Sequence, residues 1–179
     1  MSQVYFNSDL HLGHKRVLIF HDRYRAKCMG VDTIEQHDEM IFDLWNDRIK
    51  KRDIIYILGD LGHQYHGIKT LPGTKKLLLG NHDTGKAHEY LEVFDDIIGP
   101  IAYKHHWLAH FPPVESELYG RPVIHGHTHS TGVADPKYIN VCIEMTGGKP
   151  VNFQDIKSGK FETWNRVNRP FEVIDKDSK

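Results

Sequence analysis

The chain has 179 residues, of which 39% are hydrophobic and 26% charged, and this composition suits one folded domain. A formal net charge of −1 gives no general attraction to a polyanion, although a local basic patch stays open. The two cysteines, Cys28 and Cys142, are far apart in the sequence, which argues against a disulfide framework and favours a reducing compartment. No apolar run approaches the roughly 20 residues that span a bilayer, and no leader peptide is evident, so we expect a cytoplasmic protein.

The first half of the chain alternates between strand and helix patterns. A short apolar run at 4–6 predicts a strand, whereas residues 14–32 are mixed and basic and favour a loop that could hold a short helix. Apolar residues then recur at helical spacing from 34 to 49, with Asp32 or Thr33 as the cap. Runs at 53–58 and 77–79 predict buried strands, and a helix is expected around 86–94.

The second half is richer in strands. β-favouring residues predict strands at 97–103, 107–110, 122–125 and 138–143. Because early strands alternate with helices and later ones follow one another, we expect an α/β protein with mixed rather than purely parallel sheets.

Groups of polar residues stand at the carboxyl ends of several apolar runs, and they hold five of the 14 histidines. The groups are Asp9-Leu10-His11, Gly59-Asp60, Gly80-Asn81-His82-Asp83, His110 and Gly126-His127-Thr128-His129. Ligands of open α/β sheets bind at the carboxyl ends of strands, so these groups could converge on one site. Carboxylate and imidazole together suit Mn²⁺, Fe or Zn²⁺. The two oxygens of an isolated carboxylate such as Asp60 can bridge two ions.

The spacing within two of these groups is also informative. In Asp9-x-His11 and in His127-x-His129 the two side chains are two positions apart, so on an extended chain both point the same way. Each pair could then reach one metal centre. The glycines at 59, 80 and 126 allow the backbone to turn sharply at the strand ends.

The five groups, in this order, resemble the calcineurin-like metallophosphoesterase pattern of D-x-H, G-D, G-N-H-D/E, H and G-H-x-H. The resemblance covers roughly residues 3–156. It is closest to short single-domain members from bacteria and phages, which often carry D-x-H-x-G-H, here residues 9–14, and a W-N pair, here Trp45-Asn46. It implies a single domain over 1–179 built as a four-layer αββα sandwich, with a dimetal site at the carboxyl ends of the strands and an extension at 160–179 of open role.

The resemblance also implies a role for each matching residue. The first ion would be held by Asp9, His11 and His129, the second by Asn81, His110 and His127, and Asp60 would bridge both. His82 would protonate the leaving oxygen, and Asp83 would orient the His82 ring. The implied activity is hydrolysis of a phosphate ester by a hydroxide that bridges two divalent ions, with Mn²⁺ favoured and Fe, Zn²⁺ or Ni²⁺ accepted.

The substrate is less well defined by the sequence. A small phosphate ester is expected, and a nucleotide is an option; a diester is slightly favoured over a monoester because a chain without a cap domain leaves the site open. His14 could line the substrate pocket or stand exposed in a loop. Arg23 is a candidate clamp for a second phosphate, against the alternative of a solvated loop. His37 is expected at the surface.

Two rival functions stay open. A catalytically silent scaffold of the same fold is disfavoured because His82 and every ligand position are intact. A nuclease is disfavoured by the net charge of −1, so nucleic acid is not the expected partner. The oligomeric state cannot be read from the sequence.

Overall fold

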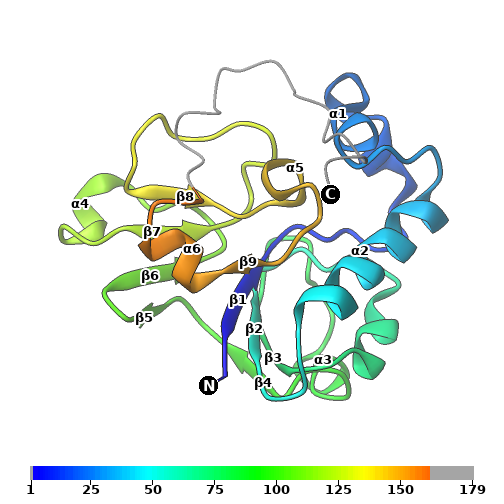
Figure 1. The fold of residues 1–179 in the computed structure, drawn as a ribbon, viewed down its shortest axis with the longest axis horizontal. Coiled ribbons are helices and arrows are strands. Elements are labelled where there is room, and N and C mark those ends of the chain that lie inside the picture. The colour runs from blue at the N-terminus through cyan, green and yellow to red at the C-terminus, as the bar shows by residue number, and fades with distance from the viewer. Residues whose placement is uncertain (1, 162–179) are drawn as a thin grey trace.

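The computed structural model describes residues 2–161 (Figure 1), so most of the expected extension at 160–179 lies outside the described residues. The strands are β1 (Val4–Asn7), β2 (Ile54–Ile57), β3 (Thr74–Leu78), β4 (Asp96–Ile98), β5 (Ile101–Tyr103), β6 (His106–Ala109), β7 (Val123–His125), β8 (Tyr138–Asn140) and β9 (Val151–Asn152). The α-helices are α1 (Phe20–Met29), α2 (Ile34–Arg48), α3 (Ala87–Tyr90), α4 (Glu115–Leu118), α5 (Ile143–Thr146) and α6 (Phe153–Lys157), and 3₁₀ turns are η1 (Lys15–Leu18) and η2 (Tyr65–Thr70). Within residues 2–161, none of the helices has the length and apolarity needed to span a membrane.

The strands form two mixed sheets. The first has the order β4-β3-β2-β1-β9, with β1 to β4 parallel and β9 antiparallel to β1. The second has the order β5-β6-β7-β8, with β6 to β8 parallel and β5 antiparallel to β6. The predicted α/β fold with mixed sheets is therefore confirmed, while the four-layer arrangement stays a prediction.

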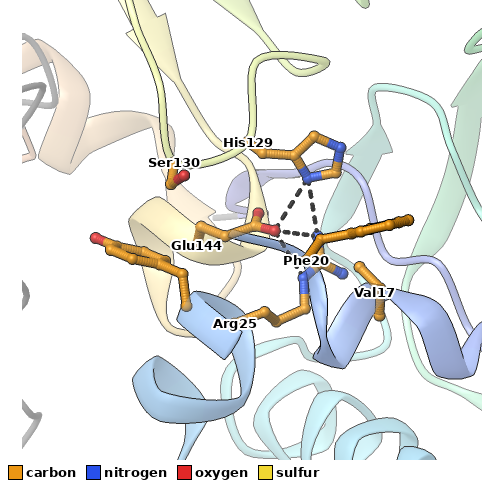
Figure 2. Close-up of a pocket in the computed structure, with 7 residues that line it drawn as sticks. Val17, Phe20, Arg25, His129, Ser130 and Glu144 are labelled. Carbon is orange, nitrogen blue, oxygen red and sulfur yellow. Dashed lines mark hydrogen bonds and ion pairs between the residues drawn. The ribbon is translucent and has the colours of Figure 1, made fainter. Parts of the chain in front are cut away.

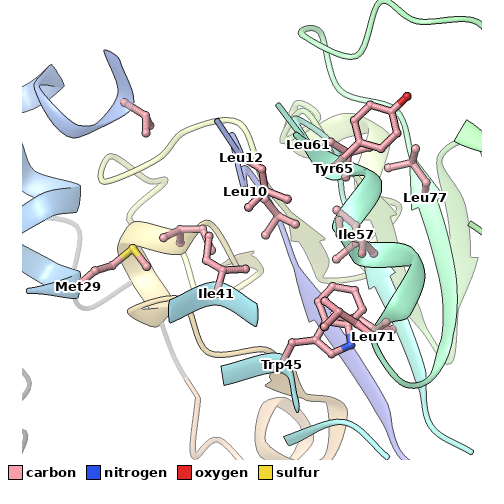
Figure 3. Packing of buried hydrophobic residues seen from close by; sticks show 14 of the residues in the cluster. Leu10, Leu12, Met29, Ile41, Trp45, Ile57, Leu61, Tyr65, Leu71 and Leu77 are labelled. Atoms are coloured by element: carbon pink, nitrogen blue, oxygen red, sulfur yellow. The ribbon is translucent and has the colours of Figure 1, made fainter. Parts of the chain in front are cut away.

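The apolar run of β2 divides its side chains between two cores. Tyr56 belongs to a buried cluster that includes Leu108 and Ile124 of the second sheet. Ile57, on the opposite face, packs with Trp45 of α2 in a second cluster (Figure 3). Because strand side chains alternate between faces, a sheet covered on both sides needs an unbroken apolar run, as the sequence has here.

Several elements differ from the sequence prediction. The predicted strand at 97–103 is two strands in different sheets, because Gly99-Pro100 breaks the chain and proline cannot donate to a ladder. The predicted strand at 138–143 ends at Asn140, and the helix expected at 86–94 shortens to one turn. The basic stretch holds the ten-residue helix α1, which ends at the left-handed Gly30.

Helix α2 follows the prediction in its extent but not at every position. Thr33 is its N-cap and forms a capping box with Gln36. His37, expected at the surface, is fully buried because it lies on the helix face that carries Ile41 and Trp45. Its Nδ1 lies 2.7 Å from Asp38 Oδ1, and Asp38 Oδ2 accepts a hydrogen bond from the backbone of Gly13.

Candidate metal centre

The predicted ligands follow β1, β2 and β3 of the first sheet and β6 and β7 of the second, and the fold brings them together. Asp9 Oδ1 lies 3.9 Å from His11 Nε2 and 3.7 Å from His129 Nε2. Asp60 Oδ2 lies 3.8 Å from His11 Nε2 and 3.6 Å from His110 Nε2. Side chains separated by more than a hundred residues in the sequence therefore surround one small volume.

Two overlapping sets of side chains could hold metal ions. Within each set, Asp9 with His11 and His129 and Asp9 with Asp60 and His110, the ligand atoms lie within 4.8 Å of one another. The first set is the one that the sequence predicted for the first ion. Asp60 lies between His11 and His110, as a bridging carboxylate must, although the role of each residue stays a prediction.

The Asp9 carboxylate uses its two oxygens differently. Oδ2 accepts hydrogen bonds from Ser8 Oγ at 2.6 Å, His127 N at 2.8 Å and Cys142 Sγ at 3.1 Å. Oδ1 is buried without a hydrogen-bond partner among the described residues, and so is His11 Nε2. A buried polar atom without a partner typically costs about 1–3 kcal/mol. One cation between the two atoms would satisfy both, so these residues fit a metal ion.

Asn81 also places an oxygen close to imidazole nitrogens in a way that fits a bound cation. Its Oδ1 lies 2.9 Å from His110 Nε2 and 3.0 Å from His127 Nδ1. His110 Nδ1 lies 2.7 Å from the carbonyl of Leu58, which can only accept, so Nδ1 carries the proton and Nε2 presents its lone pair. Two acceptors this close repel unless a positive charge lies beside them. Ligands bound to one ion at about 2.1 Å stand about 3 Å apart, which matches these separations.

His129 is oriented by a buried ion pair that the sequence analysis missed (Figure 2). Its Nδ1 lies 3.0 Å from Glu144 Oε1, and Arg25 Nε and Nη2 each lie 2.8 Å from the same oxygen. Arg25 Nη2 is also 3.3 Å from His129 Nδ1, but a guanidinium only donates, so the carboxylate accepts the imidazole proton. His129 Nε2 is thereby left to face Asp9.

The loops that carry the ligands have unusual backbone conformations. Asp9 (φ 59°), His11 (φ 48°), Asp60 (φ 58°), His127 (φ 70°) and His129 (φ 49°) all lie in the left-handed region. The extended geometry expected for D-x-H and H-x-H is therefore wrong; the side chains converge through tight turns instead. Such conformations cost about 1–3 kcal/mol each and cluster at functional sites.

Glycine is required at two positions of the predicted groups, because neighbouring atoms lie too close to leave room for a side chain. A Cβ on Gly126 would overlap Ser8 Oγ and press on Asp9 Oδ2. A Cβ on Gly80 would overlap the Asp60 carboxylate and backbone. Neither position tolerates a side chain without moving a predicted ligand.

No family model matches this chain. The gene 66 protein of Mycobacterium phage L5 is 31% identical over an aligned region that covers 73% of this chain and 79% of that protein. This chain belongs to the gene 66 protein family.

Two solved structures are similar to this member of the gene 66 family. AQ665 from Aquifex aeolicus, a protein of unknown function, aligns with a TM-score of 0.67 and 25% identity over 88% of this chain and 99% of its own. The nuclease MPE of Pseudomonas putida aligns with a TM-score of 0.46 and 20% identity over 70% of this chain and 60% of its own, a likeness too low to carry a functional argument.

His82 and Asp83 occupy different positions in this gene 66 family member. The His82 side chain is 60% exposed, with Nε2 4.0 Å from Asp60 Oδ2, and its backbone N–H donates to Asp60 Oδ1 at 2.9 Å. Asp83 accepts from the backbone N–H groups of Asp60, Leu61 and Gly80 at 2.7, 2.9 and 2.8 Å. In the described chain no hydrogen bond joins Asp83 to the His82 ring, so Asp83 ties together the loops that follow β2 and β3.

The two predicted substrate-binding residues also differ in position. His14 is half-buried at the edge of the centre, with its ring centroid 5.6 Å from that of His11. Arg23 is exposed and pairs with Asp32 at 3.2 Å. It is Arg25, two positions further on, that contacts His129 of the centre, and no signal in the sequence separates the two arginines.

Burial and charge set the protonation of the central groups. Burial, with the nearby charge of Arg25, lowers the pKa of His11 to about 3, so this imidazole is neutral at pH 7. Burial alone would raise the pKa of Asp9, but His129 and His110 and the Ser8 hydrogen bond outweigh it and lower that pKa. Burial would also raise the pKa of Glu144, yet Arg25 and His129 bring it to about 2. A neutral imidazole beside an ionised carboxylate is the form in which both bind metal ions.

Proposed function

We propose that this protein hydrolyses phosphate esters with two divalent metal ions. The observation that carries the proposal is the convergence of carboxylate, imidazole and amide side chains from both sheets. Among residues 2–161, the buried atoms Asp9 Oδ1 and His11 Nε2 have no hydrogen-bond partner. The resemblance to calcineurin-like metallophosphoesterases supports it, and so do two mixed sheets with a shared core and helices packed outside the first.

The ligand assignment follows the two groups of contacts. Asp9, His11 and His129 would hold one ion, and Asn81, His110 and His127 would hold the other, with Asp60 between them. Bound ions would neutralise the charge of a phosphoryl group and activate a water molecule. Carboxylate, amide and imidazole ligands are compatible with Mn²⁺, Fe, Zn²⁺ and Ni²⁺.

His82 is proposed as the proton donor to the leaving oxygen. Its exposed ring stands over the centre, close to Asp60 Oδ2, and its backbone is fixed by the hydrogen bond to Asp60 Oδ1. A substrate phosphate beside Asp60 would therefore place its leaving group within reach of the imidazole. Asp83 is proposed to act indirectly, by fixing the backbone on both sides of the centre.

The proposed substrate is a small phosphate ester, with a diester favoured over a monoester. The test uses metal-stripped protein and two chromogenic substrates, bis(p-nitrophenyl) phosphate and p-nitrophenyl phosphate, with Mn²⁺, Zn²⁺, Ni²⁺ or Mg²⁺ added. Metal-dependent release of nitrophenol from the diester, faster than from the monoester, is expected. If folded protein binds two ions and releases no nitrophenol from either substrate, a silent scaffold becomes the better description.

A further inference from the structure

Three histidines outside the predicted ligand set stand beside the candidate centre, and we call His14, His63 and His82 the histidine rim. They lie on the loops that follow the neighbouring parallel strands β1, β2 and β3. The ring centroids of His14 and His82 lie 5.6 Å and 5.5 Å from that of the predicted ligand His11. The His63 ring lies 5.8 Å from that of His14. The histidine rim therefore starts at the predicted metal ligands and continues outward to the exposed His63.

The loops that carry His14 and His63 are joined by their backbones. Leu12 N donates to the carbonyl of Leu61 at 2.8 Å, and His63 N donates to the carbonyl of Leu12 at 2.7 Å. A Cβ on Gly62, which has a φ of 92°, would stand 2.3 Å from Leu12 N, so the two loops leave no space between them. The parallel pairing of β1 and β2 thus continues past the strands and fixes where the two imidazoles stand.

The histidine rim offers nitrogen atoms to a ligand in surroundings that favour an anion. Within residues 2–161, no hydrogen bond or ion pair engages the side chain of His14 or of His63. Burial lowers the pKa of His14, and the charges of His63, His82 and Arg16 lower that pKa further, so its strongest charged neighbours are cations. A neutral imidazole still donates one N–H, and N–H donors beside cationic groups are suited to a phosphate.

We infer that the histidine rim binds a second phosphate of the substrate, carried by the leaving group. The inference rests on the proposed function, because it takes the centre to hold the phosphate that is hydrolysed. His82 stands between the two positions, since its Nε2 lies 4.0 Å from Asp60 Oδ2 while its ring belongs to the rim. A leaving group that passes His82 would meet the N–H groups of His14 and His63. The substrate class is therefore a compound with two phosphates, rather than an ester with an uncharged leaving group.

The deciding experiment is equilibrium binding of phosphonates, whose carbon–phosphorus bonds are not hydrolysed. Methylphosphonate, methylenediphosphonate and trimethylenediphosphonate are titrated by calorimetry into protein loaded with Mn²⁺, so that the second phosphonate is offered at two spacings. At least one diphosphonate is expected to bind about tenfold more tightly than methylphosphonate, because a hydrogen bond to a charged group is worth at least that ratio. In His63→Ala this ratio is expected to fall towards one, while the stoichiometry of Mn²⁺ stays at the wild-type value.

A matched control comes from the same segment of the chain. His66 is also exposed, but its ring stacks on that of Tyr65 with centroids 4.6 Å apart, so His66→Ala should keep the wild-type ratio. An unchanged ratio in His63→Ala, as when a diphosphonate merely chelates the ions, would overturn the inference, and so would loss of Mn²⁺ in that variant. A ratio that falls in His63→Ala, in protein that hydrolyses neither chromogenic ester, would keep the histidine rim and reject the proposed function.

Discussion

Arg25 and Glu144 form a buried ion pair across 119 residues of sequence, with Arg25 Nη2 2.8 Å from Glu144 Oε1. The same arginine donates to the carbonyl of Leu10, and the same glutamate accepts from His129. One pair of charges thus connects α1, the loop after β1 and the loop after β7. Its main effect is to fix the direction in which His129 presents its free nitrogen.

Replacing Glu144 with glutamine should weaken metal binding. Loss of the carboxylate that orients a metal-binding histidine typically costs about 10–100-fold in metal affinity. Calorimetric titration of Glu144→Gln with Mn²⁺ should show one of two sites weakened to this extent. Glu115→Gln, which removes an exposed partner of Lys137, is the control and should bind like the wild type. Two unaffected sites in Glu144→Gln would rule out the orienting role.

Loss of His82 should slow hydrolysis without releasing metal. A general acid is typically worth about 10²–10⁴-fold in rate, so kcat of His82→Ala should fall within that range. Its ion stoichiometry should stay at the wild-type value, whereas Asp60→Asn should lose both metal and activity because Asp60 lies among the predicted ligands. His88→Ala, at an exposed position in α3, serves as the control. A large loss of metal in His82→Ala would show that it is a ligand instead.

A methyl group at position 126 should damage the centre. Gly126→Ala pushes a Cβ into Ser8 and Asp9, and overpacking of this kind costs about 1–3 kcal/mol. Urea unfolding should show that loss, together with weaker Mn²⁺ binding because Asp9 must move. At Gly99 no atom of residues 2–161 lies within 4 Å of an added Cβ, so Gly99→Ala should change stability by less than about 0.5 kcal/mol. Equal behaviour of the two variants would contradict the close-packing argument.

The buried His37 should make stability depend on pH. Burial lowers its pKa below the usual value near 6.5, although the hydrogen bond to Asp38 opposes the shift. The unfolded chain therefore binds a proton at a higher pH than the folded protein does, and the free energy of unfolding decreases as the pH falls below about 6.5. Urea midpoints of metal-free protein from pH 7.5 to 5.5 should fall less in His37→Asn than in the wild type. Parallel curves would exclude His37 as a contributor.

The sequence predicted the elements whose pattern is local. The β2 run, the amphipathic α2 helix and its Thr33 cap all depend on residues a few positions apart, and the structure confirms them. The ligand groups also converge as expected, because parallel strands present their carboxyl ends at one edge of a sheet. The way they converge was not predictable: left-handed conformations at Asp9 and His129 follow from tertiary packing and not from the residue type alone.

The residues that the sequence did not reveal are those whose partners are distant. Arg23 and Arg25 stand in one basic stretch, and only the helix of α1 decides that Arg25 turns inward to Glu144 while Arg23 pairs with Asp32 outside. His37 was misplaced for a similar reason, since its burial depends on which face of α2 meets the core. Asp83 was assigned to the ring of its neighbour, but its oxygens bind backbone amides across two loops.

The bond from His127 N to Asp9 Oδ2 spans 118 residues, and it has a consequence for biosynthesis. Asp9 is translated before His127 and Cys142, which both donate hydrogen bonds to its carboxylate. A chain whose translation stops before residue 127 carries Asp9, His11 and Asp60 but lacks His127 and His129, which complete the predicted ligand set. The centre can therefore close around Asp9 only after residue 127 has been translated.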